Sequence, residues 1–169
     1  MSQKRQAARV VLLNPSNEIF LIHSEDPIDP FKPSWWEIPG GGVGWGEDSA
    51  TAASRELWEE TGIEAEMGPV IWTQQVQFTF GPYFFDNDEK IHIAWCDGGE
   101  YQPKHLEALE AAAFIEAQWW SAEDLLSSEF PVLPERLREF FPDLTQGNIP
   151  STPIDISQGR GHSAVQNQI

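Results

Sequence analysis

The sequence predicts one α/β domain, and three observations lead to that fold class. The chain has 169 residues, 40% of them hydrophobic, which suits a single domain with its own core. Short apolar segments separated by turn residues predict strands. Between them, residues 49–61 have the capping signals and the three- to four-residue spacing of an α-helix.

The first elements are predicted to form a hairpin. Residues 8–13 are apolar and β-branched, residues 14–17 (Asn-Pro-Ser-Asn) are typical of a turn, and residues 19–22 are apolar again. Three prolines then indicate a loop over residues 27–33, and five glycines fall within residues 40–46. We therefore expect two paired strands and a glycine-rich connection to the helix.

The helix predicted over residues 49–61 has a signal at each end. Asp48 or Ser49 can cap its N-terminus by accepting hydrogen bonds from free amides, and Gly62 can end it. Small and apolar side chains at helical spacing predict the face that packs on a sheet. These side chains are Ala50, Ala53, Leu57 and Thr61.

The next segments predict further strands. An aromatic, β-like pattern covers residues 70–85, a separate strand is expected over 90–96, and another over 114–120. Residues 106–112 fit either a helix or a turn. The second half of the chain therefore adds most of the expected sheet.

Two short helices and a tail are expected at the end of the chain. Ser121 begins a capping-box pattern, and Pro134 can occupy the first turn of a last helix that ends near Phe141. After that the chain is polar, with few large apolar residues. We therefore expect a domain over residues 1–143 and a polar tail over 144–169.

The charge of the chain limits its partners. Twenty-seven acidic residues against ten basic ones give a net charge of −17. Such a surface repels nucleic acid polymers and anionic membranes, so neither is expected as a partner, and a small anionic substrate would need a bridging cation. The single cysteine, Cys96, excludes an internal disulfide. Without a secretory pattern or a long apolar run, the expected location is cytoplasmic.

Three carboxylates on the predicted helix suggest a metal site. Glu59 and Glu60 follow Glu56 by three and four residues, so the three side chains share one face. Oxygen ligands at this density suit Mg²⁺ or Mn²⁺ rather than zinc. Glu47 lies just before the helix, and Arg55 can reach back to it as a bidentate pair that holds the loop. Taken alone, such an acidic face also fits a solvated surface.

Residues 41–63 resemble the Nudix box at every specified position. The box is G-x5-E-x7-R-E-U-x-E-E-x-G-U, with U an aliphatic residue, and it runs here from Gly41 to Ile63. Residues 36–41 (Trp-Glu-Ile-Pro-Gly-Gly) and residues 119–125 resemble the flanking segments of MutT-like members. The chain is thus similar to the Nudix hydrolase superfamily over residues 8–141, with the box as its specific part.

The resemblance implies a fold and an activity. The fold is a three-layer α/β/α sandwich around a mixed central sheet. The activity is hydrolysis, with Mg²⁺ or Mn²⁺, of the diphosphate linkage in a nucleoside diphosphate joined to another moiety. The class stays open between a MutT-like nucleoside triphosphate pyrophosphohydrolase and a nucleotide-sugar or ADP-ribose hydrolase. The alternative is a non-catalytic nucleotide-sensing or interaction module on the same fold.

The resemblance also implies roles for the box residues. Glu56 and Glu60 match the principal metal ligands, Glu59 supports them, and the Gly41 carbonyl can add a ligand. The pair that orients the loop is matched by Glu47 and Arg55. A nearby glutamate would take the proton from the attacking water, and the candidates are Glu56 and Glu110. The expected catalytic set is therefore Glu56, Glu59 and Glu110.

The substrate side is predicted from aromatic and small residues. Trp35 and Phe78, together with Trp72 and Phe80, can supply a face for a base to stack on, although any one of them fits packing in the core or the sheet better. Gly41 and Gly42 let the backbone approach a ligand closely. The expected partner is a small nucleotide, and a homodimer is a further expected state because many members are dimers. The basic residues Lys4, Arg5 and Arg9 could steer an anion, but the default expectation for them is a frayed N-terminus.

Overall fold

A mixed β-sheet runs through the middle of the computed structural model, which describes residues 4–157. Its strands are β1 (Arg5–Leu13), β2 (Ile19–Ser24), β3 (Trp35–Glu37), β4 (Gly40–Gly42), β5 (Glu66–Phe80), β6 (Tyr83–Trp95), β7 (Phe114–Trp120), β8 (Val132–Leu133) and β9 (Ile154–Asp155). Within the described residues the order is β8-β3-β2-β1-β6-β5-β9, with β4 paired to β1 and β7 paired to β2. The pairs β1–β6, β3–β8 and β5–β9 are parallel, and the other pairs are antiparallel.

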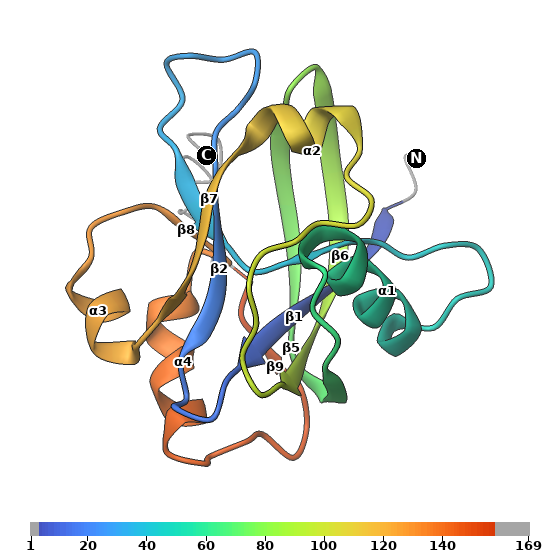
Figure 1. Ribbon diagram of the computed structural model, residues 1–169. Helices are drawn as coiled ribbons and strands as arrows, with labels where there is room; N and C mark the ends of the chain where they lie inside the picture. The colour runs from blue at the N-terminus through green and yellow to red at the C-terminus, as the bar shows by residue number, and fades with distance from the viewer. Residues whose placement is uncertain (1–3, 158–169) are drawn as a thin grey trace.

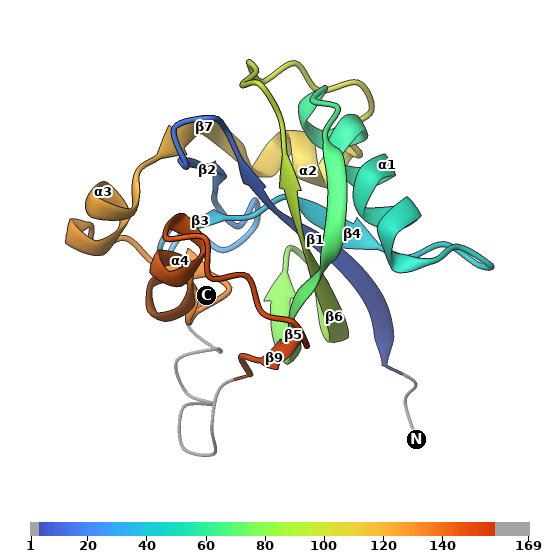
Figure 2. The ribbon, with the colours of Figure 1, turned by 90° about the horizontal axis from the view of Figure 1, so that it is seen from below.

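Helices cover both faces of this sheet (Figure 2). They are α1 (Ser49–Thr61), α2 (Ala108–Ala113), α3 (Ala122–Ser127) and α4 (Leu137–Thr145). The helix α1 lies on one face, α3 and α4 lie on the other, and α2 crosses one end of the sheet (Figure 1). The predicted three-layer α/β/α sandwich is therefore confirmed. In the part of the chain that the structure describes, every helix is too short or too polar to cross a membrane.

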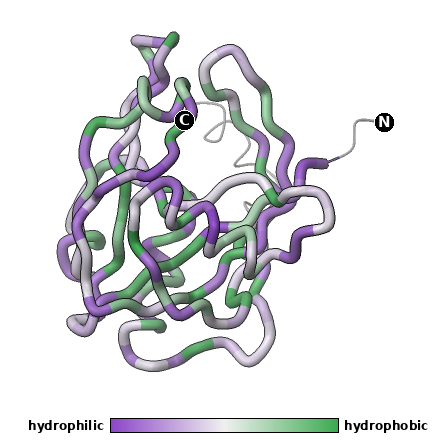
Figure 3. Tube along the Cα trace, turned by 45° about the vertical axis from the view of Figure 1, so that its right-hand side comes forward, coloured by the Kyte–Doolittle hydropathy of each residue, from purple (hydrophilic) through white to green (hydrophobic). Residues whose placement is uncertain are grey.

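The strand β1 separates two hydrophobic cores by its two-residue alternation. Ala8, Val10 and Leu12 pack in the core beneath α1. Val11 and Leu13 point the other way, into the larger core with Leu137 and Phe141 of α4. Figure 3 shows the corresponding mixture of hydrophobic and hydrophilic residues along the chain. The β-branched pattern that predicted this strand thus describes a central strand with both faces buried.

The predicted hairpin of β1 and β2 is confirmed, but its strands separate soon after the turn. Leu13 pairs with Ile19, and beyond this point β1 pairs in parallel with β6 while β2 pairs with β3 and β7. Side chains of both strands line one cavity, described below. Because β1 and β2 separate, residues from both strands can line the same cavity.

The helix predicted over residues 49–61 is confirmed at both ends. The Asp48 carboxylate accepts from the Thr51 amide at 2.7 Å, and Gly62 ends the helix with φ of 74°. The predicted packing face needs one correction. Ala50 is exposed, and Ala52 is buried with Ala53, Leu57 and Thr61.

Two boundaries in the second half of the chain differ from the prediction. Residues 70–85 contain the tight turn between β5 and β6, and residues 90–96 continue β6 instead of forming a separate strand. The last helix begins at Leu137 and ends at Thr145, so Leu144 is buried in the core. Ile156 is also buried there, which places part of the expected tail against the domain. Residues 158–169 of that tail lie outside the described residues.

Gly62 offers a test of the helix end. The substitution Gly62→Ala is expected to lower the free energy of unfolding by more than about 1 kcal/mol, because φ is positive and a Cβ would clash with the Gln102 carbonyl oxygen. Gly46 is the matched control, since it has the same φ of 74° and nothing within 4 Å of a Cβ. Urea unfolding should therefore show a smaller loss for Gly46→Ala. Equal losses in the two variants would contradict the predicted clash.

Candidate active site

A cavity of about 630 Å³ lies between α1, the helix that carries the Nudix-box glutamates, and the β5–β6 hairpin. We call α1 the box helix and residues 40–48 the box loop. Its acidic side is formed by residues from α1 and from the loop and helix that follow β6. They are Glu56, Glu59, Glu60, Glu107 and Glu110. Its other side is mainly aromatic, with Trp35, Phe78, Phe80, Tyr83 and Phe85. The cavity therefore brings an acidic wall and an aromatic wall together.

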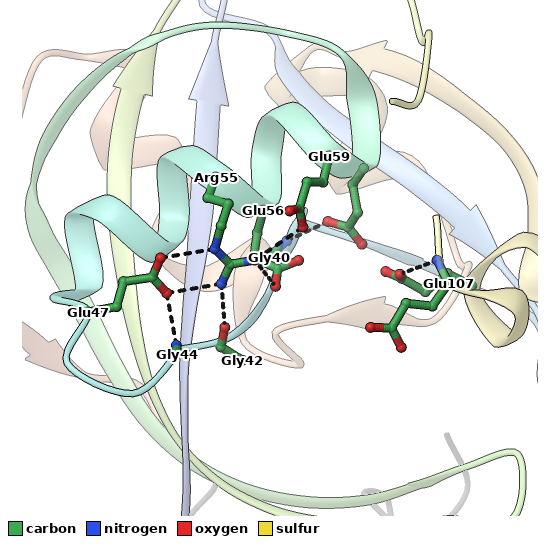
Figure 4. A network of polar contacts seen from close by, with 10 residues as sticks. Gly40, Gly42, Gly44, Glu47, Arg55, Glu56, Glu59 and Glu107 are labelled. Carbon is green, nitrogen blue, oxygen red and sulfur yellow. Dashed lines mark hydrogen bonds and ion pairs between the residues drawn. The ribbon is translucent and has the colours of Figure 1, made fainter. Parts of the chain in front are cut away.

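Arg55 joins the glycine-rich loop to the acidic face of α1 (Figure 4). Its Nε and Nη2 donate to the two carboxylate oxygens of Glu47 at 2.9 and 3.0 Å, and Nη2 also donates to the Gly42 carbonyl at 3.0 Å. Its Nη1 donates to Glu56 and Glu59, each at 3.1 Å. The bidentate contact lowers the pKa of Glu47 to about 2. The predicted Glu47–Arg55 pair therefore exists and fixes the loop against the helix.

Glu60 and Glu56 approach the backbone of the same loop. Glu60 accepts a hydrogen bond from the Gly40 amide at 2.8 Å. A Cβ on Gly41 would lie 2.6 Å from the Glu56 carboxylate, so a larger residue at this position would displace that carboxylate. Burial, reinforced by the Glu110 carboxylate, holds the pKa of Glu60 well above its ordinary value. Burial also raises the pKa of Glu56, against the attraction of Arg55.

Glu110 belongs to the acidic wall but comes from α2, whereas the box glutamates come from α1. It lies in α2, where its carboxylate accepts from the amide of Glu107 at 3.1 Å. The loop before α2 is held to the end of α1, because the amides of Lys104 and His105 donate to the Glu59 carbonyl at 2.9 Å. This arrangement places Glu110 beside the box carboxylates, although fifty residues separate it from Glu60.

The donor set fits a hard divalent cation. All its donors are carboxylate oxygens and backbone carbonyls, which are the ligands that Mg²⁺ and Mn²⁺ prefer. Burial raises the pKa of both Glu56 and Glu60, so a bound cation would offset the cost of keeping these two carboxylates charged. As they stand, no three His, Cys, Asp or Glu side chains within residues 4–157 converge tightly enough to hold a metal ion. Binding would therefore require side-chain movements, such as release of Glu56 and Glu59 from Arg55.

Three of the four aromatic residues expected at the substrate line the cavity. They are Trp35, Phe78 and Phe80. Phe78 stacks on Phe85 with ring centroids 5.1 Å apart. The expectation for Trp72 is wrong, since this side chain is 1% exposed and belongs to the hydrophobic core that packs on α4, outside the cavity lining. The register of β5 is regular from Trp72 to Phe80, so Trp72 shares a face with Phe78 but lies further along the strand, where it packs against Phe140 of α4.

Two arginines at the start of the chain also line the cavity. The expectation of a frayed terminus is wrong for Arg5 and Arg9, because both belong to β1. The Arg5 guanidinium lies 4.9 Å from the centroid of the Phe85 ring, and burial lowers its pKa. A Cβ on Gly42 would lie 2.8 Å from its Nη2, so this cation sits next to the box loop.

Arg9 belongs to a buried polar cluster on the floor of the cavity. Its Nε donates to Glu89 at 2.9 Å, and the side chains are 17% and 1% exposed. Glu89 also accepts from Gln74 at 2.7 Å and from Asn87 at 3.0 Å. Although burial opposes it, the Arg9 guanidinium lowers the pKa of Glu89. The sequence offered one signal for this cluster, namely the single charged residue Arg9 within the apolar segment 7–13.

Comparison with known proteins agrees with this geometry. An RNA pyrophosphohydrolase of Novosphingobium aromaticivorans is 30% identical over 138 residues, which cover 72% of this chain and 80% of that protein. An RNA pyrophosphohydrolase of Roseobacter denitrificans is 40% identical over 67 residues, or 40% of this chain and 39% of that protein. The MutT protein of Methanosarcina mazei Go1 has a similar fold, with a TM-score of 0.62 and 22% identity over 88% of this chain and 99% of that one.

The match to a protein family covers most of the chain. The family model of the NUDIX domain matches residues 3–144, a range that holds the box helix, the aromatic wall and Glu110. The chain therefore belongs to the NUDIX domain family, as the resemblance of residues 41–63 predicted.

Proposed function

We propose that this chain is a divalent-metal-dependent pyrophosphohydrolase that cleaves the diphosphate linkage of a small nucleotide. The observation that carries this proposal is that Glu56, Glu59, Glu60 and Gly41 line one wall of a single cavity. Its volume of about 630 Å³ falls within the range of about 300–1,000 Å³ that is usual for small-molecule sites. Relatives named RNA pyrophosphohydrolase support the reaction class.

The box carboxylates would hold the metal. We assign Glu56, Glu59, Glu60 and the Gly41 carbonyl as the residues that bind Mg²⁺ or Mn²⁺. When bound, such an ion would neutralise charge on the diphosphate and make an attacking water more acidic. Arg55 and Glu47 would keep the Gly41 loop against α1, so that the carbonyl and the carboxylates stay within reach of one another.

Glu110 is the proposed general base. Its carboxylate reaches the cavity from α2 and makes no ion pair with Arg55, unlike Glu56 and Glu59. It is therefore not committed to the box network and would take the proton from the attacking water. The hydrogen bond that the Glu110 carboxylate accepts from the Glu107 amide fixes the direction of the Glu110 side chain.

The remainder of the cavity would bind the substrate. Arg5 lies beside the box loop without an ion-pair partner among the described residues, so we assign it to a phosphate group. The stacked rings of Phe78 and Phe85 offer a surface for the nucleobase, with Trp35 on the neighbouring side. With a net charge of −17, the protein is expected to prefer a short nucleotide to a long RNA.

A substrate panel tests this function. The protein is incubated with Mg²⁺ and nucleoside triphosphates, ADP-ribose, nucleotide sugars or a short 5′-triphosphorylated oligonucleotide, and the phosphorylated products are measured. We expect turnover of at least one class and its loss after addition of EDTA. Nucleotide binding without any product would contradict the proposal and support the non-catalytic module instead.

Metal binding gives a prediction that is independent of turnover. Mg²⁺ or Mn²⁺ should raise the melting temperature, because an ion that binds only the folded protein stabilises it by about 2.7 kcal/mol at one hundred times its Kd. Differential scanning fluorimetry over a concentration series, with K⁺ at equal ionic strength as the control, measures this shift. A melting temperature that does not depend on the divalent ion would contradict the assigned metal site.

A further inference from the structure

A buried ion pair lies in the loop between β2 and β3. The side chains of Asp26 and Lys32 are 2% and 5% exposed, and Lys32 Nζ lies 3.3 Å from Asp26 Oδ2. Taking two charges out of water costs free energy that a buried ion pair barely recovers. Neither residue belongs to a strand, a helix or the box. The position of this pair therefore suggests a purpose other than stability.

The two oxygens of Asp26 have different partners. Oδ1 accepts from two amides of its own loop, at 3.0 and 3.1 Å. Oδ2 accepts from the amide of Gly81 at 3.2 Å, and Gly81 forms the turn between β5 and β6. Lys32 Nζ donates to the carbonyl of Thr79 and to its hydroxyl, the latter at 3.4 Å. One oxygen thus shapes the loop, whereas Oδ2 and Lys32 tie the loop to the tip of the hairpin.

The segments joined by this pair carry the aromatic wall of the cavity. Lys32 Nζ lies 5.5 Å from the centroid of the Trp35 ring, and Trp35 packs edge-on against Phe80 with centroids 6.2 Å apart. Trp35, Thr79 and Phe80 all line the cavity. On its other side the hairpin tip rests on α2, since a Cβ on Gly81 would lie 3.0 Å from Leu109. The ion pair therefore holds Trp35 and the tip of the β5–β6 hairpin in their positions at the edge of the cavity.

We propose that Asp26 and Lys32 are positioning residues that set how tightly the cavity binds the nucleoside part of its substrate. This inference rests on the proposed function, which assigns the nucleoside to the aromatic wall. The contacts of the pair reach Trp35 and the hairpin tip, whereas the diphosphate is assigned to α1 and the box loop on the other wall. The pair thus acts on substrate affinity and leaves the cleavage step unchanged.

Two substitutions cut the connection at different atoms. Asp26→Asn can keep the oxygen that accepts from the loop amides, but it replaces the oxygen that accepts from Gly81 and Lys32 with a donor. Lys32→Met keeps the length of the side chain and removes the ammonium group. Each should raise KM for the preferred nucleotide by about tenfold through a displaced wall, with kcat unchanged. Lys32→Arg should restore much of the affinity, and Lys90→Met, at an exposed lysine of β6, is the matched control.

Two further measurements separate this inference from a general loss of structure. The inhibition constant of inorganic pyrophosphate, which has no nucleoside, should be the same in all variants. Amide hydrogen exchange of residues 76–85 should be faster in Asp26→Asn and Lys32→Met than in the wild type and in Lys90→Met. Circular dichroism at the assay temperature confirms that each variant is folded, and if either Asp26→Asn or Lys32→Met is not, the other carries the test.

The results also separate this inference from the proposed function. Unchanged KM, unchanged exchange of the hairpin tip, or a fall in kcat equal to the rise in KM would each overturn the role of Asp26 and Lys32. If the wild type turns over nucleotide and the variants have the same KM, the proposed function holds and the role of Asp26 and Lys32 is overturned. A wild type that neither binds nor cleaves any nucleotide overturns the proposed function and the affinity claim together, whatever the exchange rates show.

Discussion

Glu60→Gln is expected to lower kcat by at least about 10²-fold, because loss of a metal ligand exceeds the 10- to 100-fold effects seen for groups behind the ligands. Glutamine has nearly the same shape, and its carbonyl oxygen can keep the hydrogen bond from the Gly40 amide. Burial already opposes the charge of Glu60, as its raised pKa shows. The variant should therefore fold as well as the wild type without metal, but lose the increase in melting temperature that Mg²⁺ causes.

A second glutamate-to-glutamine substitution serves as the control for this prediction. Glu139 lies on α4 and pairs with Arg136 at 2.7 Å, with its own side chain 58% exposed and away from the residues that line the cavity. Glu139→Gln should leave both kcat and the response to Mg²⁺ unchanged. Full turnover by Glu60→Gln would show that Glu60 does not hold the metal.

Arg9→Met is expected to cause the largest loss of stability, about 3–5 kcal/mol, because it leaves the Glu89 carboxylate buried and without its cation. Glu89 is 1% exposed, so its carboxylate depends on Arg9, Gln74 and Asn87 rather than on solvent in the native protein. Urea unfolding at neutral pH measures the loss. The double variant Arg9→Met/Glu89→Met should recover most of it, because apolar side chains can replace a buried ion pair at little cost.

The same pair predicts a change in the pH dependence of stability. In the wild type Arg9 lowers the pKa of Glu89, so its contribution to stability is present at neutral pH and is lost as pH falls through that lowered pKa. In Arg9→Met the burial that raises the pKa of Glu89 is no longer opposed by the Arg9 charge, and only the hydrogen bonds from Asn87 and Gln74 still lower this pKa. The stability deficit of the variant should therefore shrink on acidification from pH 8 to about pH 5. A deficit that is independent of pH would contradict the pairing of Arg9 with Glu89.

The elements that depend on local signals were predictable from the sequence. Asp48 and Gly62 mark the ends of α1, and the spacing of Glu56 and Glu60 places both on its acidic face. The box pattern then implied the sandwich, which the strand order confirms. The turn at Gly81 also had a signal, since Gly-Pro is typical of turns, although the prediction did not use it.

The missing parts of the site depend on contacts between distant residues. Arg5 and Arg9 reach the cavity because β1 pairs in parallel with β6, and no periodicity in either strand indicates which partner it takes. The same holds for Asp26, whose partner Gly81 lies 55 residues away. Trp72 shows the converse, since an aromatic residue in the expected strand lies too far along that strand to reach the cavity and is buried in the core. Residue types predicted which chemistry was present, but strand pairing decided which residues share a cavity.

The contact between Arg55 and Glu47 depends on the number of residues between them, because that number sets the direction in which Arg55 points from the helix axis. Each residue added to an α-helix turns everything beyond it by about 100° about the axis. One residue inserted within 50–54 would swing the guanidinium away from the Glu47 carboxylate, 2.9 Å from it in the native chain, and carry the following glutamates around with it. Composition and helix propensity would hardly change. The gap of seven residues between Glu47 and Arg55 thus fixes the orientation of Arg55 around the helix axis as well as its distance from Glu47.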